Sequence, residues 1–197
     1  MIELINYPNG KKISESNVTH HISASRRGMT LEADINQTNE YYLSTDKAVI
    51  HKKPTPVQIV HVDYPKRTAA KITEAYFKVP STTDYNGIYR GKYIDFEAKE
   101  TASKTSFPFS SIHPHQIEHL KKVLQHGAIG FFIIRFKAYD ETFFVEASKI
   151  IPHYLDDQKR SLSYKWFKEE GILIPFGLSP SVHYLKVIDQ LYFRRSV

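Results

Sequence analysis

The sequence predicts an α/β fold in which a mixed central sheet is flanked by helices and a basic β-hairpin projects from the sheet. The most apolar run of the chain, residues 128–136, is typical of a central strand. Segments on both sides of this run carry apolar residues at helical spacing. Between residues 52 and 78, two extended segments flank a basic turn, which indicates a hairpin.

Length and composition predict one globular domain. The chain has 197 residues, of which 41% are hydrophobic and 24% charged, and it has no Cys, so disulfides and thiolate metal sites are excluded. No apolar run approaches the roughly 18 residues of a membrane helix, and the first residues do not resemble a signal peptide, so we expect a cytoplasmic protein without a membrane partner. We expect a flexible arm over residues 1–25 and a single domain over residues 26–197, with the hairpin inserted at about 52–78.

The expected elements follow in chain order. Residues 30–45 should form a helix, because Leu31, Ile35 and Tyr42 recur on one face. Residues 113–126 should form another, with Pro114 in its first turn and Gly127 ending it. The remaining expected elements are a short strand at 48–52, hairpin arms at 57–62 and 69–79, a strand pair at 81–89 and 92–99, strands at 128–136 and 142–147, a mainly helical stretch at 148–170, and an ordered element of open type at 184–193.

Positive charge is concentrated in the hairpin segment. The chain carries 27 Lys and Arg against 21 Asp and Glu, and residues 51–80 hold six basic and two acidic side chains. Aromatic residues are interleaved with them, which favours a polyanion over a membrane surface, although a solvated basic face remains an equal alternative. Tyr64 and Phe77 are candidates for stacking on bases. The candidate phosphate contacts are Lys52, Lys53, Lys66, Arg67 and Lys71, with Arg27 before the first helix.

An acidic cluster with a lysine follows the hairpin. Alternate residues of a strand share a face, so Asp95, Glu97 and Lys99 should project together, with Asp84 contributed by the preceding strand. Carboxylates are ligands that Mg²⁺ prefers, and a lysine beside them could stabilise charge on a phosphate in transfer. The spacing alone is more typical of a row of surface ion pairs, so this alternative stays open, whereas the apolar–charged alternation and the basic segment upstream favour a site.

These residues belong to a longer series that resembles a known family. Asp84 with Glu97-Ala98-Lys99 resembles the core of the PD-(D/E)xK nuclease superfamily, and the series as a whole is similar to the RecU-type Holliday junction resolvases. Thr83 stands where the superfamily has a proline before its first acidic residue. The series runs in order through Asn6-Tyr7-Pro8-Asn9-Gly10, Arg27-Gly28-Met29-Thr30-Leu31-Glu32, 51–60, Tyr64-Pro65-Lys66-Arg67, 81–87, 93–101, Lys104-Thr105-Ser106-Phe107-Pro108, His115-Gln116 and 189–193.

The resemblance implies a restriction-endonuclease-like core and a homodimeric endodeoxyribonuclease that resolves four-way DNA junctions by paired symmetric nicks in recombination and repair. It implies a requirement for Mg²⁺, for which Mn²⁺ can substitute, and a projecting stalk at 52–78. A strand-exchange recombinase and a branch-migration helicase are the protein partners it suggests. By position, the metal ligands would be Thr82, Asp84, Glu97 and Gln116, and the catalytic lysine Lys99.

Glu32 and a group of three histidines are further candidates for a role in the site. Glu32 is a possible accessory group at the metal or the substrate, or simply a carboxylate favoured in the first turn of a helix. His113, His115 and His119 form a cluster, but no HExxH pattern accompanies them and we do not expect a zinc site.

The alternative function is a non-catalytic junction-binding protein that modulates a strand-exchange recombinase.

Overall fold

The computed structural model describes residues 30–193, apart from the side chain of Arg67. The expected arm over residues 1–25 and Arg27 lie outside the described residues. No helix within the described part of the chain is long and apolar enough to cross a membrane.

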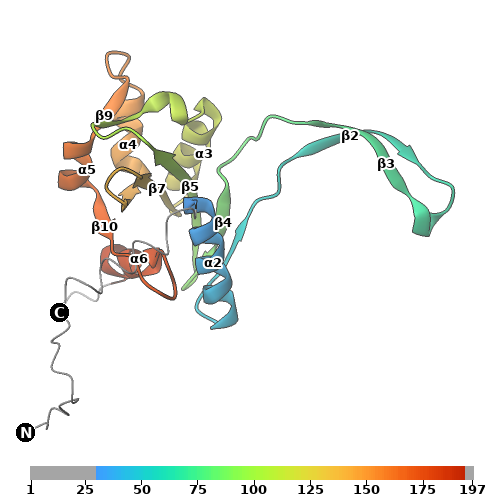
Figure 1. The fold of residues 1–197 in the computed structure, drawn as a ribbon, viewed down its shortest axis with the longest axis horizontal. Helices are drawn as coiled ribbons and strands as arrows, with labels where there is room; N and C mark the ends of the chain where they lie inside the picture. Colours follow the sequence, from blue (N-terminus) through green and yellow to red (C-terminus); the bar gives the residue numbers. More distant parts are fainter. Residues whose placement is uncertain (1–29, 194–197) are drawn as a thin grey trace, which may run out of the picture. The chain divides into compact units, whose positions relative to one another are not determined.

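A six-stranded mixed sheet forms the centre of the fold (Figure 1). Its fourth strand, β7, pairs with β5 in parallel and with β8 in antiparallel orientation, and the other pairs are antiparallel. The expected α/β class and mixed sheet are therefore confirmed. In spatial order, the strands are β1 (Val49–Lys52), β4 (Tyr85–Tyr89), β5 (Lys92–Thr101), β7 (Ile129–Phe136), β8 (Glu141–Glu146) and β10 (Ile172–Ile174).

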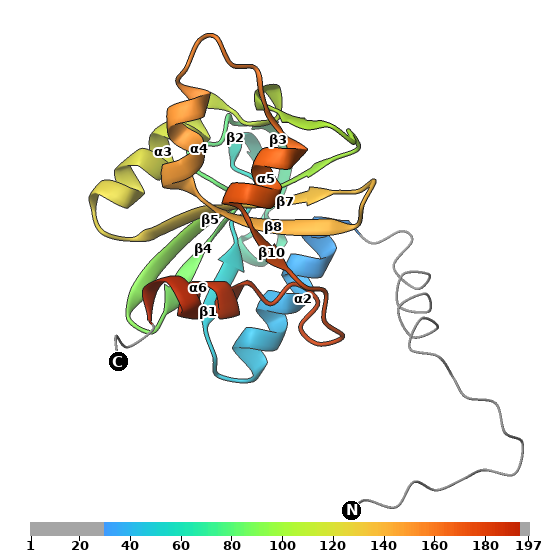
Figure 2. The same ribbon diagram turned by 90° about the vertical axis from the view of Figure 1, so that its left-hand side faces the viewer.

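Helices cover both faces of this sheet (Figure 2). On one face α2 (Leu31–Ser44) and α6 (Tyr184–Tyr192) pack against Phe131 and Ile133 of β7. On the other face α3 (Pro114–Gln125), α4 (Ala147–Tyr154) and α5 (Tyr164–Glu170) pack against Phe132 and Ile134. Because alternate residues of β7 enter two cores, the whole strand is buried, as its unbroken apolar run predicts.

Local signals set the ends of α3. Pro114 occupies its first turn, where the missing N–H leaves no hydrogen bond unmade. Gly127 follows the helix with φ of +76°, a left-handed conformation that glycine adopts without steric cost. The expected helix of residues 113–126 is present with one residue fewer at each end, and it packs against β5 and β7.

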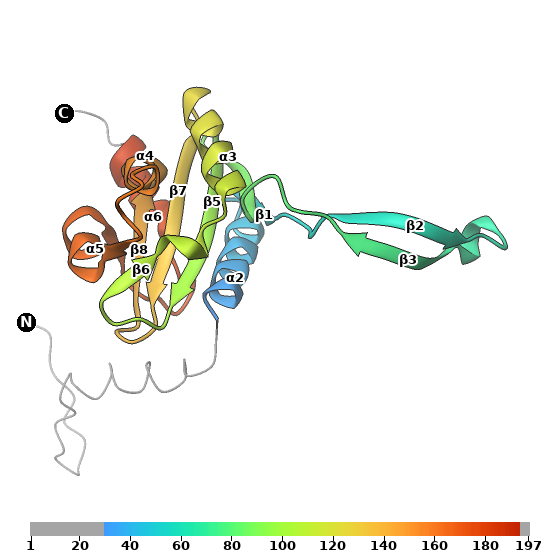
Figure 3. The same ribbon diagram turned by 90° about the horizontal axis from the view of Figure 1, so that it is seen from above.

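The hairpin of residues 52–78 is also confirmed. Its strands β2 (Val57–Asp63) and β3 (Lys71–Phe77) pair with each other, and a 3₁₀ turn, η1 (Arg67–Ala69), lies between them. Every residue of both strands is exposed, and Figures 1 and 3 show the ribbon extending away from the six-stranded sheet. An exposed two-stranded ribbon cannot be a core element, so its apolar side chains are available to a ligand.

Short strands are where the structure departs from expectation. β6 (Ser106–Pro108) pairs with β9 (Ser161–Ser163), so the stretch 148–170, expected to be mainly helical, is interrupted between α4 and α5. A 3₁₀ turn, η2 (Phe109–Ser111), follows β6, and β10 adds an edge strand that was not expected. Three-residue strands carry too few alternations to be recognised from sequence, because their partners lie far along the chain.

Candidate active site

Strands β4 and β5 bring the acidic residues together. In their antiparallel register Tyr85 lies opposite Phe96, which places Asp84 next to Glu97. The backbone N–H of Asp84 donates a hydrogen bond of 3.1 Å to Glu97 Oε2. The two expected carboxylates therefore lie side by side, although β4 begins at Tyr85, so Asp84 lies just before the strand and not on it as expected.

The charged face of β5 lies beneath α3. Ile94 and Phe96 point into the core formed with α2 and α6, so the alternate residues face the side covered by α3. Asp95 and Glu97 have no exposed surface, although they are charged residues. The alternative of a surface ion-pair row is therefore wrong, because such a row would face solvent. Charged residues this deeply buried need specific partners.

Lys99 is the partner of Glu97. The distance between Lys99 Nζ and Glu97 Oε1 is 2.8 Å, and the lysine side chain is 20% exposed. Burial raises the pKa of the Glu97 carboxyl to about 7, Lys99 acts in the opposite direction, and the nearby Asp84 raises it further. The effect of Asp84 shows that the two carboxylates share one electrostatic environment, which is unfavourable for two negative charges without a cation.

The donors at this position fit a hard divalent cation. Glu97 Oε1 is buried and receives no well-oriented hydrogen bond among the described residues, although the Lys99 ammonium lies beside it. Thr82 lines a hollow of about 220 Å³ together with Asp84, so the two residues border one space. Oxygen donors of this kind suit Mg²⁺ or Mn²⁺. Thr82, Asp84 and Glu97 could therefore hold such an ion.

Gln116 lies in the first turn of α3 and is 4% exposed. Its Oε1 accepts a 2.9 Å hydrogen bond from the backbone N–H of His113, which fixes the side chain at the start of the helix. A carbonyl oxygen has a second lone pair, so this bond leaves a further position for a ligand. The predicted role of Gln116 as a metal ligand remains a prediction.

His115 is a member of the site that sequence reasoning missed. Burial lowers the pKa of its imidazole, and so do the charges of His113 and Lys99, whereas Asp84 raises it. Its ring stacks on His113 with 5.4 Å between centroids, and its Nε2 is buried without a hydrogen-bond partner among the described residues. Only the packing of α3 against β5 places it here, so no spacing in the sequence could have found it.

The other predicted residues take separate positions. Glu32 Oε1 lies 2.5 Å from Lys52 Nζ in an exposed ion pair, so Glu32 stands outside the acidic cluster. Lys53 turns inward, where its Nζ lies 3.0 Å from Asp95 Oδ2. Lys66 and Lys71 are exposed on the hairpin, which also carries Arg67. The predicted phosphate contacts therefore lie in three different places: Lys53 points inward, Lys52 forms a surface ion pair, and Lys66, Arg67 and Lys71 belong to the hairpin.

The three histidines do not form a metal centre. His119 Nε2 lies 3.0 Å from Asp95 Oδ2, while His113 and His115 stack on each other. No group of three or more acidic or histidine side chains with metal-site geometry occurs within residues 30–193. His119 is therefore the partner of a buried carboxylate.

A carboxylate at the start of one strand, with a carboxylate and a lysine on the strand paired with it, inside a mixed sheet flanked by helices, is the arrangement of a PD-(D/E)xK nuclease. The family model described as Recombination protein U, RecU, matches residues 26–190. The chain belongs to the RecU family.

Two relatives that carry the RecU name agree with this assignment. The Holliday junction resolvase RecU of Oceanobacillus iheyensis is 55% identical over 196 residues, covering 96% of this chain and 100% of the relative. That of Bacillus thuringiensis is 49% identical over 197 residues, covering 96% and 98%. Among solved structures, the Hjc Holliday junction resolvase of Archaeoglobus fulgidus matches with a TM-score of 0.40 and 10% identity, covering 67% of this chain and 87% of that one.

Proposed function

We propose that the protein is a Mg²⁺-dependent endonuclease that resolves four-way DNA junctions in recombination and repair. The observation that carries this proposal is the cluster of Asp84, the buried Glu97 and Lys99 beside the root of an exposed basic hairpin. Relatives that match nearly the whole chain bear the name Holliday junction resolvase, which supports the same substrate.

Asp84 and Glu97 would hold the metal ion, with Thr82 and Gln116 as neutral oxygen ligands. Such an ion, when bound, would polarise the scissile phosphate and lower the pKa of an attacking water. Lys99 is held by Glu97 at 2.8 Å yet remains 20% exposed, so its ammonium can contact a phosphate oxygen on which negative charge develops. The raised pKa means that the metal-free site disfavours the ionised form of Glu97, and a cation bound beside it would favour that form instead.

Junction recognition is assigned to the hairpin. Lys66 and Lys71 place positive charge on it, and no β2 or β3 side chain is committed to the core of the domain. Tyr64 is 62% exposed and Phe77 is 83% exposed, so both rings are free to contact unstacked bases at the centre of a junction. Lysine contacts to phosphate supply affinity without sequence preference, which suits recognition of DNA shape.

Paired nicks need two sites. The described residues hold one acidic-lysine cluster per chain, so a homodimer is the simplest assembly that cuts two strands symmetrically. A strand-exchange recombinase and a branch-migration helicase are proposed as partners, and the cytoplasm as the place of action.

The test is cleavage of a synthetic four-way junction by purified protein with Mg²⁺ and with EDTA. We expect nicks with Mg²⁺ or Mn²⁺ and none with EDTA. Asp84→Asn and Glu97→Gln should abolish nicking while junction affinity stays within about threefold, because neither carboxylate attracts DNA. Full cleavage by either variant would overturn the site. Intact strands under every divalent ion would instead indicate the alternative, a protein that binds junctions without cutting them.

A further inference from the structure

Asp95 is the most heavily bonded carboxylate near the active site, and the function proposed above does not use it. It has no exposed surface. Its Oδ2 lies 3.0 Å from Lys53 Nζ, 2.9 Å from the hydroxyl of Tyr93 and 3.0 Å from His119 Nε2. Its Oδ1 accepts a hydrogen bond from the hydroxyl of Thr83. Both oxygens are therefore occupied by donors from separate parts of the chain.

Two of these donors stand at the two limbs of the hairpin root. Lys53 follows β1 and precedes Pro54, on the limb that leads out to β2. Thr83 lies on the limb that returns from β3 to β4. Lys53 Nζ also donates to Thr83 Oγ1 at 3.1 Å, and the Lys53 backbone N–H donates to the carbonyl of Asp84 at 2.7 Å. The outgoing and returning limbs are thus bonded to each other and to one carboxylate.

The third donor comes from the helix above the site. His119 lies one turn after Gln116 on α3, so the two residues share a face of that helix. Asp95 in turn lies two positions before Glu97 on β5, on the same face of the strand. A single side chain therefore connects the hairpin root, the strand of the acidic cluster and the helix that carries Gln116.

We propose that Asp95 is a positioning residue that fixes the hairpin root relative to the acidic cluster, so that contact with the junction centre determines which phosphate is cut. This proposal rests on the proposed function. No side chain of β2 or β3 packs in the core, so packing of the hairpin itself does not fix its direction. The buried Asp95 carboxylate is bonded to an ammonium, an imidazole and two hydroxyls, and these bonds favour a single arrangement of the hairpin root. A displacement of about 1 Å at a reacting group can cost about 100-fold in rate.

The variants Asp95→Asn, Lys53→Met and Thr83→Val test the connection. Asp95→Asn removes the negative charge and one acceptor oxygen, so the bonds to the Lys53 ammonium and to the Thr83 hydroxyl weaken and the root is held less firmly to β5. Thr83→Val has nearly the same shape and removes only the hydroxyl that joins the returning limb. Thr83→Ser keeps that hydroxyl and is the conservative variant that should restore wild-type behaviour. Lys121→Met removes one positive charge from the surface of α3 without touching Asp95, and should leave the positions of the nicks unchanged.

The measurement is single-turnover cleavage of a static four-way junction with every nick mapped to one nucleotide. For the three test variants we expect cutting at the wild-type phosphate to fall about 10-fold to 100-fold and new nicks to appear at neighbouring phosphates, with melting temperature and junction affinity measured alongside. Nicks at unchanged positions would overturn the proposal even if the rate falls, because a purely structural network changes the amount of active enzyme and not the position of the cut. If the wild-type protein does not cut the junction at all, that result contradicts the proposed function, and it is distinguished in this way from a failure of the inference about Asp95.

Asp95→Asn is the variant most prone to misfolding. If its melting temperature shows that it does not fold, Thr83→Val against Thr83→Ser gives the same comparison with the carboxylate intact. A Thr83→Val protein that folds and cuts at wild-type positions at the wild-type rate would overturn the proposal.

Discussion

The ammonium of Lys99 lies 2.8 Å from a Glu97 oxygen that has no contact with solvent. The carboxyl that carries this oxygen has its pKa raised to about 7, even with the lysine beside it. Burial therefore outweighs the ion pair, and the site destabilises the ionised form of Glu97 until a further positive charge arrives. The pKa of Glu97 therefore depends on whether a cation is bound beside it.

Glu97→Gln should stabilise the metal-free protein at pH 8. The folded pKa of about 7 exceeds the 4.5 that is usual for a solvated Glu, so between these values the folded state binds more protons, and the contribution of Glu97 to stability is lost as pH rises through 7. The shift corresponds to about 3 kcal/mol. In urea unfolding with EDTA we expect Glu97→Gln to be more stable than wild type by up to about 3 kcal/mol at pH 8 and nearly equal at pH 5.

A matched control for this measurement is Glu118→Gln, because that carboxylate is 56% exposed and paired with Lys121 on the surface of α3. It should change little at either pH. A Glu97→Gln protein that is less stable than wild type at pH 8 would contradict the pKa assignment.

Binding of Mg²⁺ should release protons near neutral pH. At pH 7 about half of the Glu97 carboxyls are protonated, and a cation that binds the carboxylate must displace that proton. Calorimetric titration in two buffers of different ionisation enthalpy should show release of about half a proton at pH 7 and almost none at pH 9. In Glu97→Gln no proton should be released. A binding heat that does not depend on the buffer at pH 7 would argue against this prediction.

The hairpin lysines should set part of the salt dependence of DNA binding. Lys66 and Lys71 are exposed, so replacing both by Gln should leave the melting temperature unchanged. If both contact phosphate, the slope of log K against log salt should fall by about 0.9 for each lost contact. Lys165→Gln is the control, since its side chain is 83% exposed on α5 and removes the same charge elsewhere. An unchanged slope in the double variant would show that this hairpin does not contact phosphate.

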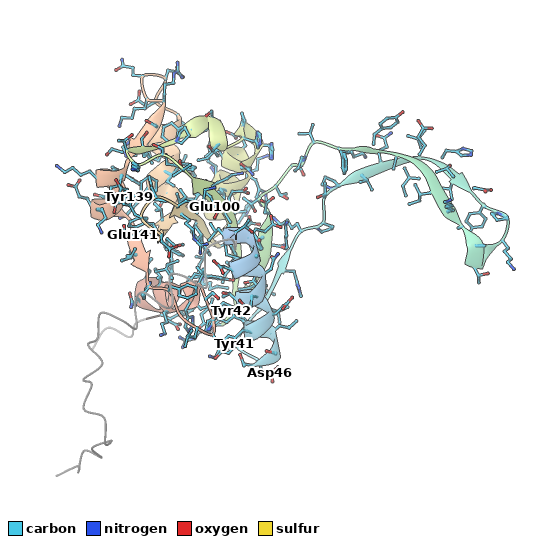
Figure 4. The ribbon with its side chains drawn as sticks, in the orientation of Figure 1. Tyr41, Tyr42, Asp46, Glu100, Tyr139 and Glu141 are labelled. Atoms are coloured by element: carbon cyan, nitrogen blue, oxygen red, sulfur yellow. The ribbon has the colours of Figure 1, made fainter. Side chains whose placement is uncertain are left out.

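Arg135 holds the start of α2 to the sheet. Its Nη2 lies 2.7 Å from Asp34 Oδ2, its Nε donates to Thr142, and both charged side chains are almost fully buried. Glu100, whose place beside α2 Figure 4 shows, accepts a hydrogen bond from the Leu31 backbone N–H. Arg135→Met should destabilise the fold by about 3–5 kcal/mol in urea unfolding, because a buried carboxylate loses its cation.

The double variant Asp34→Leu/Arg135→Met separates charge burial from loss of packing. It should recover much of the stability lost in Arg135→Met, since no uncompensated charge remains. A loss below about 1 kcal/mol in the single variant would mean that water reaches Asp34.

Local patterns in the sequence were enough for much of the fold. The apolar run of β7, the Pro114 and Gly127 signals around α3 and the alternation of β5 each depend on neighbours within a few residues. Asp84, Glu97 and Lys99 were recognised for the same reason, because alternation places residues on one face of a strand whatever surrounds it. Thr82 and Gln116 came from family resemblance alone, since a neutral oxygen donor has no local signature.

The tertiary structure alone decided how deeply these groups are buried and what they contact. Nothing near Asp95 in the chain predicts that Lys53, Thr83 and His119 converge on it, because those contacts depend on how β1, β4 and α3 pack around β5. The same packing brings His115 beside the acidic cluster and raises the pKa of Glu97. The sequence by itself thus determined which chemical groups the protein carries and on which strand face they lie. Their desolvation and their long-range partners were decided only when the helices covered the sheet, because burial and distant hydrogen bonds are properties of the assembled fold.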